Sequence, residues 1–343
     1  MKNRIYRRLA GLLVLTSGLT AVFRAAPADF TAQVFTKKNG APVADLKKED
    51  FRLFENGREQ TILRIERATR PLSIALVPML GQGQYCDTVL FLVPRKGPPI
   101  PMPLVGGAFE KYLAANDQLA MILPNSKITL FRDLEDPKLR IPEDFERFAR
   151  HSESVQHRID ENNLPLITNE TPDAEKIYYG VETIFITKAV EGTLQYLDKY
   201  AAPGSQKVLF FLRPFYNLTQ TTDADESKFK LELARQDVIV NWIGDDGAVF
   251  PIPPFKFWRR LPDETGGEKE PCSLLRSKSA DKMGGVIKGM LDRLRTRYLI
   301  VYESNNDPAA GKLRSITLDL SDAGRKKVKK QYTVAAPKSV YVE

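Results

Sequence analysis

The sequence predicts an α/β protein whose mainly parallel sheet is covered by helices on both faces, with β segments before and after it. From Leu72 onward, apolar runs of strand length alternate with helix-like stretches, which is typical of a sheet buried on both sides. On either side of that region, short runs alternate apolar and polar residues between turn signals, which indicates antiparallel strands. At 343 residues with 43% hydrophobic side chains, the chain can bury one large core and a smaller one.

The first β segment, residues 29–69, begins with the run DFTAQVFT and continues through a hairpin. In FRLFENGREQTILRIERA, the dipeptide Asn56-Gly57 stands between alternating apolar residues. Asparagine and glycine readily take the positive φ angles that a two-residue hairpin turn requires. We therefore expect a small β unit ahead of the α/β region.

The α/β region, residues 70–297, is expected to contain five strands with helices between them. The expected strands cover residues 72–79, 117–123, 127–131, 206–212 and 237–244. The expected helices cover residues 106–115, 174–200, 226–235 and 280–297, and a further helix is expected to start within Phe255–Leu261. Gly284 and Gly285 lie inside the last helix, where small residues permit the close approach of a neighbour.

The last segment, residues 298–343, is expected to form antiparallel strands over YLIVYES, KLRSITLDL and KKVKKQYTV. The lysines of the run RKKVKK, residues 325–330, are expected to protect a strand edge against pairing with another sheet. The alternative for this run is contact with an anionic surface.

The first 28 residues are predicted to be a secretory signal peptide. MKNRIYRR is a basic leader, LAGLLVLTSGLTAVF is an apolar run, and Ala26 and Ala28 place small residues at the cleavage position. The alternative is an uncleaved signal anchor. Because no other segment has the roughly 20 apolar residues of a transmembrane helix, we predict an exported protein, periplasmic or secreted, with no membrane span after signal removal.

The net charge of +8 does not indicate a nucleic-acid partner. The first 28 residues contain no acidic residue and five basic ones, Lys2, Arg4, Arg7, Arg8 and Arg24. Without them, 46 basic residues face 43 acidic ones, and the net charge falls to +3. We therefore expect no nucleic-acid binding.

The reactive side chains do not form a recognisable catalytic set. His151 and His157, the only histidines, are six residues apart in a polar stretch, whereas a metal pair on a helix needs a spacing of three or four. No nucleophile elbow or glycine-rich phosphate loop follows an expected strand. Cys86 and Cys272 are candidates for a disulfide in an oxidising compartment, but we favour two separate thiols. We predict a protein that is not an enzyme and has no cofactor.

Three stretches carry motifs that occur together in a known family. NGAPVADLKKEDFRLFENGREQTILRIERATRPLSIAL resembles V-x-G-L-x-x-x-D-F-x-x-x-E-D-G and the strand after it, and LPDETGG, Leu261–Gly267, resembles A-x-x-T-G-G. MLDRLRTRYLIVYESNNDPAAGKLRSITLDL resembles I-x-x-x-L-R-x-x-Y-x-L-x-Y followed by G-x-x-R-x-I-x-V. Together, and in this order, they resemble the von Willebrand factor A (vWA)-related proteins common in acidobacteria.

The resemblance implies a Rossmann-like, doubly wound vWA-type domain, with the β segments before and after it packing together as a separate small module. In such domains a divalent cation lies at the carboxyl ends of the strands. Its ligands come from a D-x-S-x-S loop after the first strand, a threonine of a second loop and an aspartate after the fourth strand. Threonine candidates here are Thr183 and Thr187.

This chain departs from the family at the remaining ligand positions. PLSIALVPMLGQGQ places Pro78 at the aspartate, Leu80 at the first serine and Gln82 at the second, and VLFFLRPFYN places Arg213 at the aspartate after the fourth strand. If DTVLFLVPRKGPP were the first strand instead, Pro94, Lys96 and Pro98 would stand at those positions. Either register predicts that the metal site has been lost.

We therefore expect an exported, non-enzymatic protein-binding module of the vWA type without its cation. Arg213, together with Gln82 or Gln84, is the candidate surface for a protein partner, because arginine can bind a partner's carboxylate through two hydrogen bonds. The alternative is that Arg213 pairs internally or faces solvent. The alternative functions are a structural or vestigial scaffold acting through the β module, and an extracytoplasmic hydrolase.

Overall fold

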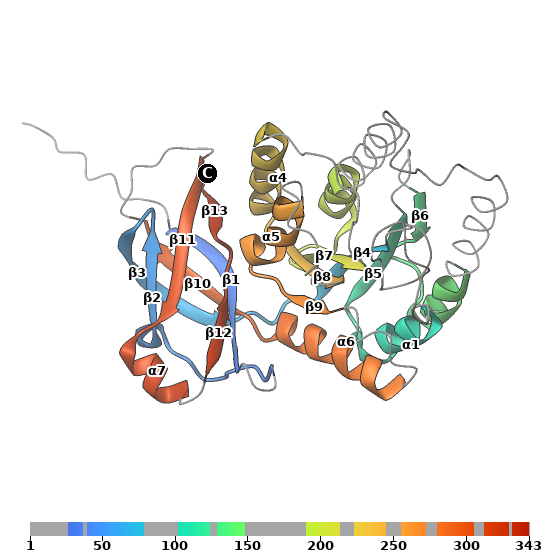
Figure 1. Ribbon diagram of the computed structural model, residues 1–343, viewed down its shortest axis with the longest axis horizontal. Helices are drawn as coiled ribbons and strands as arrows, with labels where there is room; N and C mark the ends of the chain where they lie inside the picture. The colour runs from blue at the N-terminus through green and yellow to red at the C-terminus, as the bar shows by residue number, and fades with distance from the viewer. Residues whose placement is uncertain are drawn as a thin grey trace, which may run out of the picture.

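The computed structural model describes residues 27–36, 40–78, 102–123, 129–147, 190–212, 223–244, 255–271, 280–304, 312–328 and 331–342. These residues form two units, which we call the α/β domain and the β module (Figure 1). None of the helices in this part of the chain combines the length and the apolar composition needed to cross a membrane.

The α/β domain is built on a six-stranded sheet. Its strands are β4 (Leu72–Pro78), β5 (Gln118–Leu123), β6 (Thr129–Arg132), β7 (Gln206–Leu212), β8 (Ile239–Gly244) and β9 (Lys269–Pro271). Their order is β6-β5-β4-β7-β8-β9, and all neighbours are parallel except β5 and β6. The chain therefore starts in the middle and builds outward to one side and then to the other, as in doubly wound α/β folds. Because β4 lies between β5 and β7, Leu72–Pro78 is the first strand of this sheet.

Helices cover both faces of this sheet. One face carries α1 (Met102–Tyr112), α6 (Ala280–Arg295) and helical residues 141–147, which follow the short η2 (Lys138–Arg140). The other face carries α4 (Asp223–Arg235), α5 (Phe255–Thr265) and helical residues 190–200. Figure 1 shows α1 and α6 below the sheet and α4 and α5 above it. The α/β class predicted from the alternating pattern is confirmed.

The two cores follow from the alternation of side chains along each buried strand. In β4, Leu72, Ile74 and Leu76 pack with the first helical layer, and Ala75 and Val77 pack with the second. Successive side chains of a strand point to opposite faces, so a strand covered on both sides is apolar throughout. The prediction that glycine permits close packing in α6 is also confirmed, because a Cβ at Gly284 would lie 3.2 Å from the Tyr112 ring of α1.

The β module is a curled seven-stranded antiparallel sheet whose strands come from before and after the α/β domain. Its strands are β1 (Pro27–Thr36), β2 (Phe51–Glu55), β3 (Arg58–Arg67), β10 (Tyr298–Glu303), β11 (Lys312–Leu320), β12 (Tyr332–Ala335) and β13 (Ser339–Val342). Their order is β12-β1-β10-β3-β2-β11-β13. The expected hairpin is confirmed, because Asn56 and Gly57 connect β2 to β3 with φ angles of 49° and 77°.

The C-terminal lysine run does not form the predicted strand edge. Residues Asp322–Val328 form a short helix, α7, which packs near the 3-10 turn η1 (Lys48–Asp50). Ser321 begins this helix, because its carbonyl accepts the Arg325 N–H at 2.8 Å and its hydroxyl accepts the Gly324 N–H at 3.2 Å. The run KKVKKQYTV suggested one strand, and its last residues, from Tyr332, do lie in β12. Up to Val328, the local capping by Ser321 and the contact of Gly324 with Asp50 favour the helix.

Candidate functional site

The carboxyl ends of β4 and β7 lie side by side at the place where the strand order reverses. Pro78, the last residue of β4, is in register with Leu212, the last residue of β7, and both are buried. In doubly wound sheets, ligands bind in the crevice beyond this point. The neighbouring parallel strands β5 and β8 end at Leu123 and Gly244. None of these four terminal residues has a side-chain oxygen that could bind a hard cation.

Of the candidate site residues, the structure describes Pro78. The others lie outside the described residues, and these are Leu80, Gln82, Gln84, Cys86, His151, His157, Thr183, Thr187, Arg213 and Cys272. Arg213 follows Leu212 directly in the sequence, and Leu212 is the last residue of β7. Within the described part of the chain, no group of three or more His, Cys, Asp and Glu side chains is arranged to hold a metal ion.

The Thr-Gly-Gly motif, residues 265–267, lies at the end of α5 and contacts both β8 and the β module. The Thr265 hydroxyl accepts the Val240 N–H at 2.9 Å and donates to the Leu261 carbonyl at 2.9 Å. Gly266 has a φ of 71°, a region that glycine enters without strain. A Cβ on Gly267 would lie 1.9 Å from the Val240 carbonyl oxygen, so no other residue fits against β8 there.

A buried arginine connects this motif to the β module. Arg297, which precedes β10, is only 1% exposed. Its guanidinium donates to the Gly266 carbonyl at 2.8 Å, to the Thr31 carbonyl at 2.8 Å and to the Thr31 hydroxyl at 3.1 Å. Burial lowers the pKa of Arg297 to about 10, against the attraction of the Asp237 and Glu268 carboxylates. The side chain therefore stays protonated at neutral pH and holds both units together.

A second charged network lies beside Arg297 on the same interface. Arg293 of α6 donates to Glu268 at 2.6 Å and to Glu270 at 3.0 Å, and Glu268 also accepts the Gln33 amide of β1 at 2.6 Å. The Arg293 guanidinium lies 5.7 Å from the centre of the Phe35 ring. Each buried charge thus has an opposite charge or a hydrogen-bond partner, as burial requires.

A third arginine of the same run fixes α6 to the sheet. Arg295 donates to the Tyr112 carbonyl at 3.0 Å and to the Asp117 carboxylate, whose other oxygen accepts the Leu72 N–H at 2.9 Å. The motif residues near both ends of the α/β domain thus contact the neighbouring structural elements. Sequence reasoning missed Arg293 and Arg297. The sequence signal that could have identified them is an arginine at every second position, 293, 295 and 297, at the end of a helix and directly before an apolar strand.

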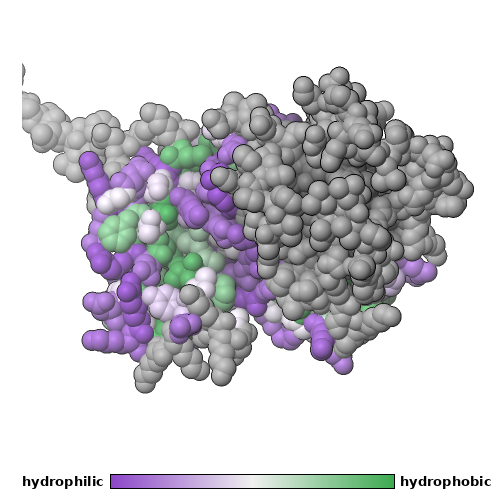
Figure 2. Space-filling view, viewed as in Figure 1, coloured by the Kyte–Doolittle hydropathy of each residue, from purple (hydrophilic) through white to green (hydrophobic). Residues whose placement is uncertain are grey.

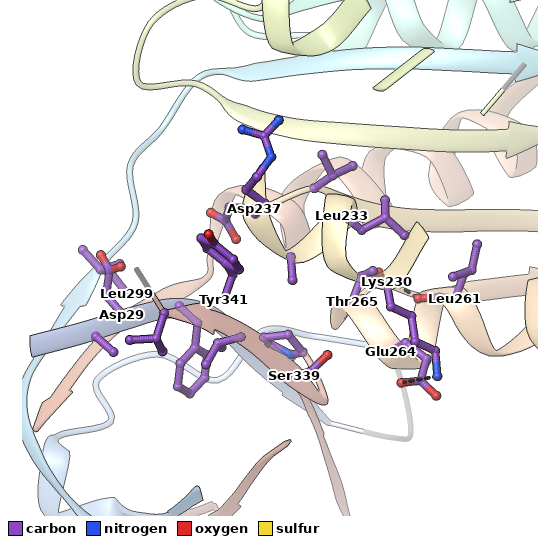
Figure 3. A pocket seen from close by; sticks show the side chains of 18 of the residues that line it. Asp29, Lys230, Leu233, Asp237, Leu261, Glu264, Thr265, Leu299, Ser339 and Tyr341 are labelled. Carbon is purple, nitrogen blue, oxygen red and sulfur yellow. Dashed lines mark hydrogen bonds and ion pairs between the residues drawn. The ribbon is translucent and has the colours of Figure 1, made fainter. Parts of the chain in front are cut away.

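A cleft of about 480 Å³ opens where the two units meet, between α4 and α5 on one side and β1 and β13 on the other (Figure 3). Six charged side chains line it, namely Asp29, Arg70, Lys230, Arg235, Asp237 and Glu264. Lys230 and Glu264 are 3.8 Å apart, and Arg70 and Asp237 are 3.4 Å apart.

A second groove, of about 630 Å³, lies between β11 and β12. Its lining includes Ile316, Leu318 and Val334. Figure 2 shows apolar side chains gathered on this face of the β module, with hydrophilic ones around them.

No protein-family model matches the sequence, and no curated protein matches it. Among solved structures, a von Willebrand factor type A protein from Catenulispora acidiphila is 11% identical, with 87% of this chain and 75% of that chain covered and a TM-score of 0.38. The conserved hypothetical protein BatB from Bacteroides thetaiotaomicron is 10% identical, with coverages of 65% and 99% and a TM-score of 0.37. An aerotolerance-related membrane protein from Bacteroides fragilis is 9% identical, with coverages of 64% and 98% and a TM-score of 0.34. At these values the likenesses carry no argument, and the fold rests on the strand order and register described above.

Proposed function

We propose that this protein is an exported, non-enzymatic protein-binding module of the vWA type that has lost its divalent-cation site. The observation that carries the proposal is the register of Pro78 with Leu212 at the crevice where the strand order reverses. The loop positions that hold the cation in vWA domains begin at these two strand ends. Here the first of those positions is a proline, and the position after Leu212 is Arg213.

The chemistry of these positions supports a cation-free mode of binding. Mg²⁺ and Ca²⁺ need carboxylate, hydroxyl or water oxygens as ligands, and neither proline nor arginine supplies one. The arginine directly after Leu212 adds a fixed positive charge to the sequence next to the strand end near which vWA domains hold the ion. Its planar guanidinium can bind a partner's carboxylate through two parallel hydrogen bonds.

Divalent cations are expected to leave the thermal stability of the protein unchanged. Specific binding to the native state at roughly 100 times the dissociation constant would stabilise it by about 2.7 kcal/mol. The measurement is a thermal melt of the purified protein with Mg²⁺, Ca²⁺ or Mn²⁺ in turn, with EDTA as the control. A clear rise of the midpoint with one cation, reversed by EDTA, would contradict the loss of the metal site.

Reversing the charge at Arg213 is expected to reduce partner capture about tenfold or more, because a carboxylate would then face a carboxylate. The measurement compares tagged wild-type protein with Arg213→Glu in pull-downs from exported fractions of the source cells, with quantification of each captured protein. Arg64→Glu is the matched control, because Arg64 is a well-exposed arginine on β3 of the β module. If the two variants capture equal amounts, Arg213 is not the binding residue.

A further inference from the structure

The curled sheet of the β module does not close. β12 pairs with β1 only over residues 33–36, and β13 pairs with β11 only over residues 312–315. Within the described part of the chain, the first half of β1 has no strand on its edge away from β10, and β13 has none on its edge away from β11. Both edges line the 480 Å³ cleft, since residues 27–30 and 339–342 belong to its walls.

The hydrogen-bonding pattern shows which main-chain groups of β1 point into the cleft. The Ala68 N–H donates to the Arg297 carbonyl, so the main-chain N–H and C=O groups of the odd-numbered residues at the start of β10 point toward β3. The main-chain groups of Ile300, an even-numbered residue, therefore point toward β1, where Ile300 pairs with Phe30. The main-chain groups of Phe30 in turn point toward β10. Because the direction of N–H and C=O alternates along a strand, the main chain of Asp29 faces the cleft.

The same reasoning applies to β13. The Ile316 N–H donates to the Lys338 carbonyl at 2.8 Å, so the main-chain N–H and C=O groups of the even-numbered residues of β13 point toward β11. The N–H and C=O groups of Ser339 and Tyr341 consequently point away from β11 and toward the cleft. No strand among the described residues pairs with them. Unpaired groups of this kind are the template to which an extended peptide adds as a further strand.

The dimensions of the cleft suit one short extended segment. At about 3.3 Å per residue, the four residues of β13 span roughly 13 Å, which is the length of about four residues of an added strand. The opposite wall comes from α4 and α5, including Leu233 and Leu261, with Leu299 and Val340 from the β module. This wall offers apolar surface to the side chains of the segment.

The charges of the cleft define the chemistry of the occupant. Lys230 is paired with Glu264, and Arg70 with Asp237. Asp29 is exposed and makes no ion pair within the described residues. Figure 3 shows Asp29 and Leu299 at one end of the cleft, Lys230 and Glu264 at the other, and Tyr341 between them. Arg235, the remaining charged residue of the lining, pairs with Glu232 at 2.6 Å and with Asp198 at 3.6 Å, and neither of these carboxylates lines the cleft. The unbalanced charge is therefore negative and lies at the Asp29 end.

We propose that this cleft binds an extended, basic peptide segment of a partner protein, which adds as a strand beside β13 with a Lys or Arg side chain against Asp29. The peptide main chain bonds to Ser339 and Tyr341, and its apolar side chains contact the α4–α5 wall. This site lies between the two units, away from the carboxyl ends of β4 and β7. It is thus a second binding surface, independent of Arg213.

The test is a selection from a phage-displayed library of random seven-residue peptides against the purified protein, followed by fluorescence-anisotropy titration of the selected peptides. The decisive variant is Tyr341→Pro, which removes a donor that faces the cleft and keeps the pairing of β13 with β11. Tyr341→Phe is the matched control, because it keeps the main-chain N–H and the ring. Asp29→Asn tests the charge and is a substitution of an exposed residue.

Selected peptides are expected to be rich in Lys or Arg and to lose affinity about tenfold or more with Tyr341→Pro. They are also expected to bind more weakly to Asp29→Asn and with unchanged affinity to Tyr341→Phe and Arg213→Glu. Failure to enrich any peptide, or equal affinity for the wild type and both Tyr341→Pro and Asp29→Asn, would overturn the proposal. A concentration-dependent dimer by light scattering that Tyr341→Pro abolishes would also overturn it, because the occupant would then be a second copy of this chain.

Discussion

Replacing Gly267 with alanine is expected to lower the free energy of unfolding by more than about 3 kcal/mol. The added Cβ would lie 1.9 Å from the Val240 carbonyl oxygen and 2.8 Å from its carbon. Val240 cannot yield, because β8 is held between β7 and β9. The Asn241 side chain cannot easily move away either, because its oxygen accepts the Glu268 N–H at 2.8 Å. Urea denaturation followed by circular dichroism measures the loss.

Gly285→Ala is the matched control for this substitution. Gly285 is exposed in the interior of α6, and no atom lies within 4 Å of the position of an added Cβ. Alanine there is expected to be neutral or to stabilise the protein by about 0.5–1 kcal/mol, because it reduces the freedom of the unfolded chain. If Gly267→Ala unfolds at the same urea concentration as Gly285→Ala, the close approach of the Thr-Gly-Gly motif to β8 is wrong.

Arg297→Met is expected to cost about 3–5 kcal/mol of stability. The substitution fills much of the same space but leaves the Gly266 and Thr31 carbonyls without their donor at a buried interface. Unpaired buried acceptors carry the full cost of their lost hydration. Arg297→Lys is expected to recover only part of the loss, because one ammonium group cannot replace a planar guanidinium with three bonds.

Arg297→Met is also expected to make the α/β domain and the β module unfold in two separate transitions. Both tryptophans, Trp242 and Trp258, lie in the α/β domain, so tryptophan fluorescence reports on that unit alone, whereas far-ultraviolet circular dichroism reports on both. The two signals should coincide in the wild type and diverge in Arg297→Met. Arg52→Met is the control, because Arg52 forms an exposed pair with Glu59, and exposed ion pairs contribute little to stability. Coincident signals and a wild-type midpoint in Arg297→Met would show that Arg297 does not couple the units.

The parts of the fold that the sequence predicted well are those with a continuous local pattern. The apolar run 206–212 is β7, and the alternating run 312–320 is β11, with the predicted bounds. β9 was not predicted, since three residues ending in Pro271 carry no recognisable period. The lysine-rich run was predicted as a strand because periodicity alone does not register the capping by Ser321.

The candidate site was predictable only where it depends on position along a strand. Pro78 was predicted near the end of a strand because it follows a strong apolar run, and it is the last residue of β4. The position of Arg213 was inferred in the same way from the run that forms β7, and Arg213 lies outside the described residues. The interface network was not predictable in this way, because a pattern-based reading assigns arginine to the surface. Arg297 is buried only because carbonyls from β1 and from the Thr-Gly-Gly motif, distant in sequence, converge on it.

The pairing of both chain ends in one sheet determines when each unit can fold during synthesis. The hydrogen bond from the Ala68 N–H to the Arg297 carbonyl shows that the chain leaves the β module and returns to it at one place. The α/β domain can therefore acquire its core while the ribosome is still producing the rest of the chain. Strands β1, β2 and β3 must wait for β10 and β11, with their edges open meanwhile. The β module is thus begun first and completed last, and its long-range pairings are expected to be the slowest to form.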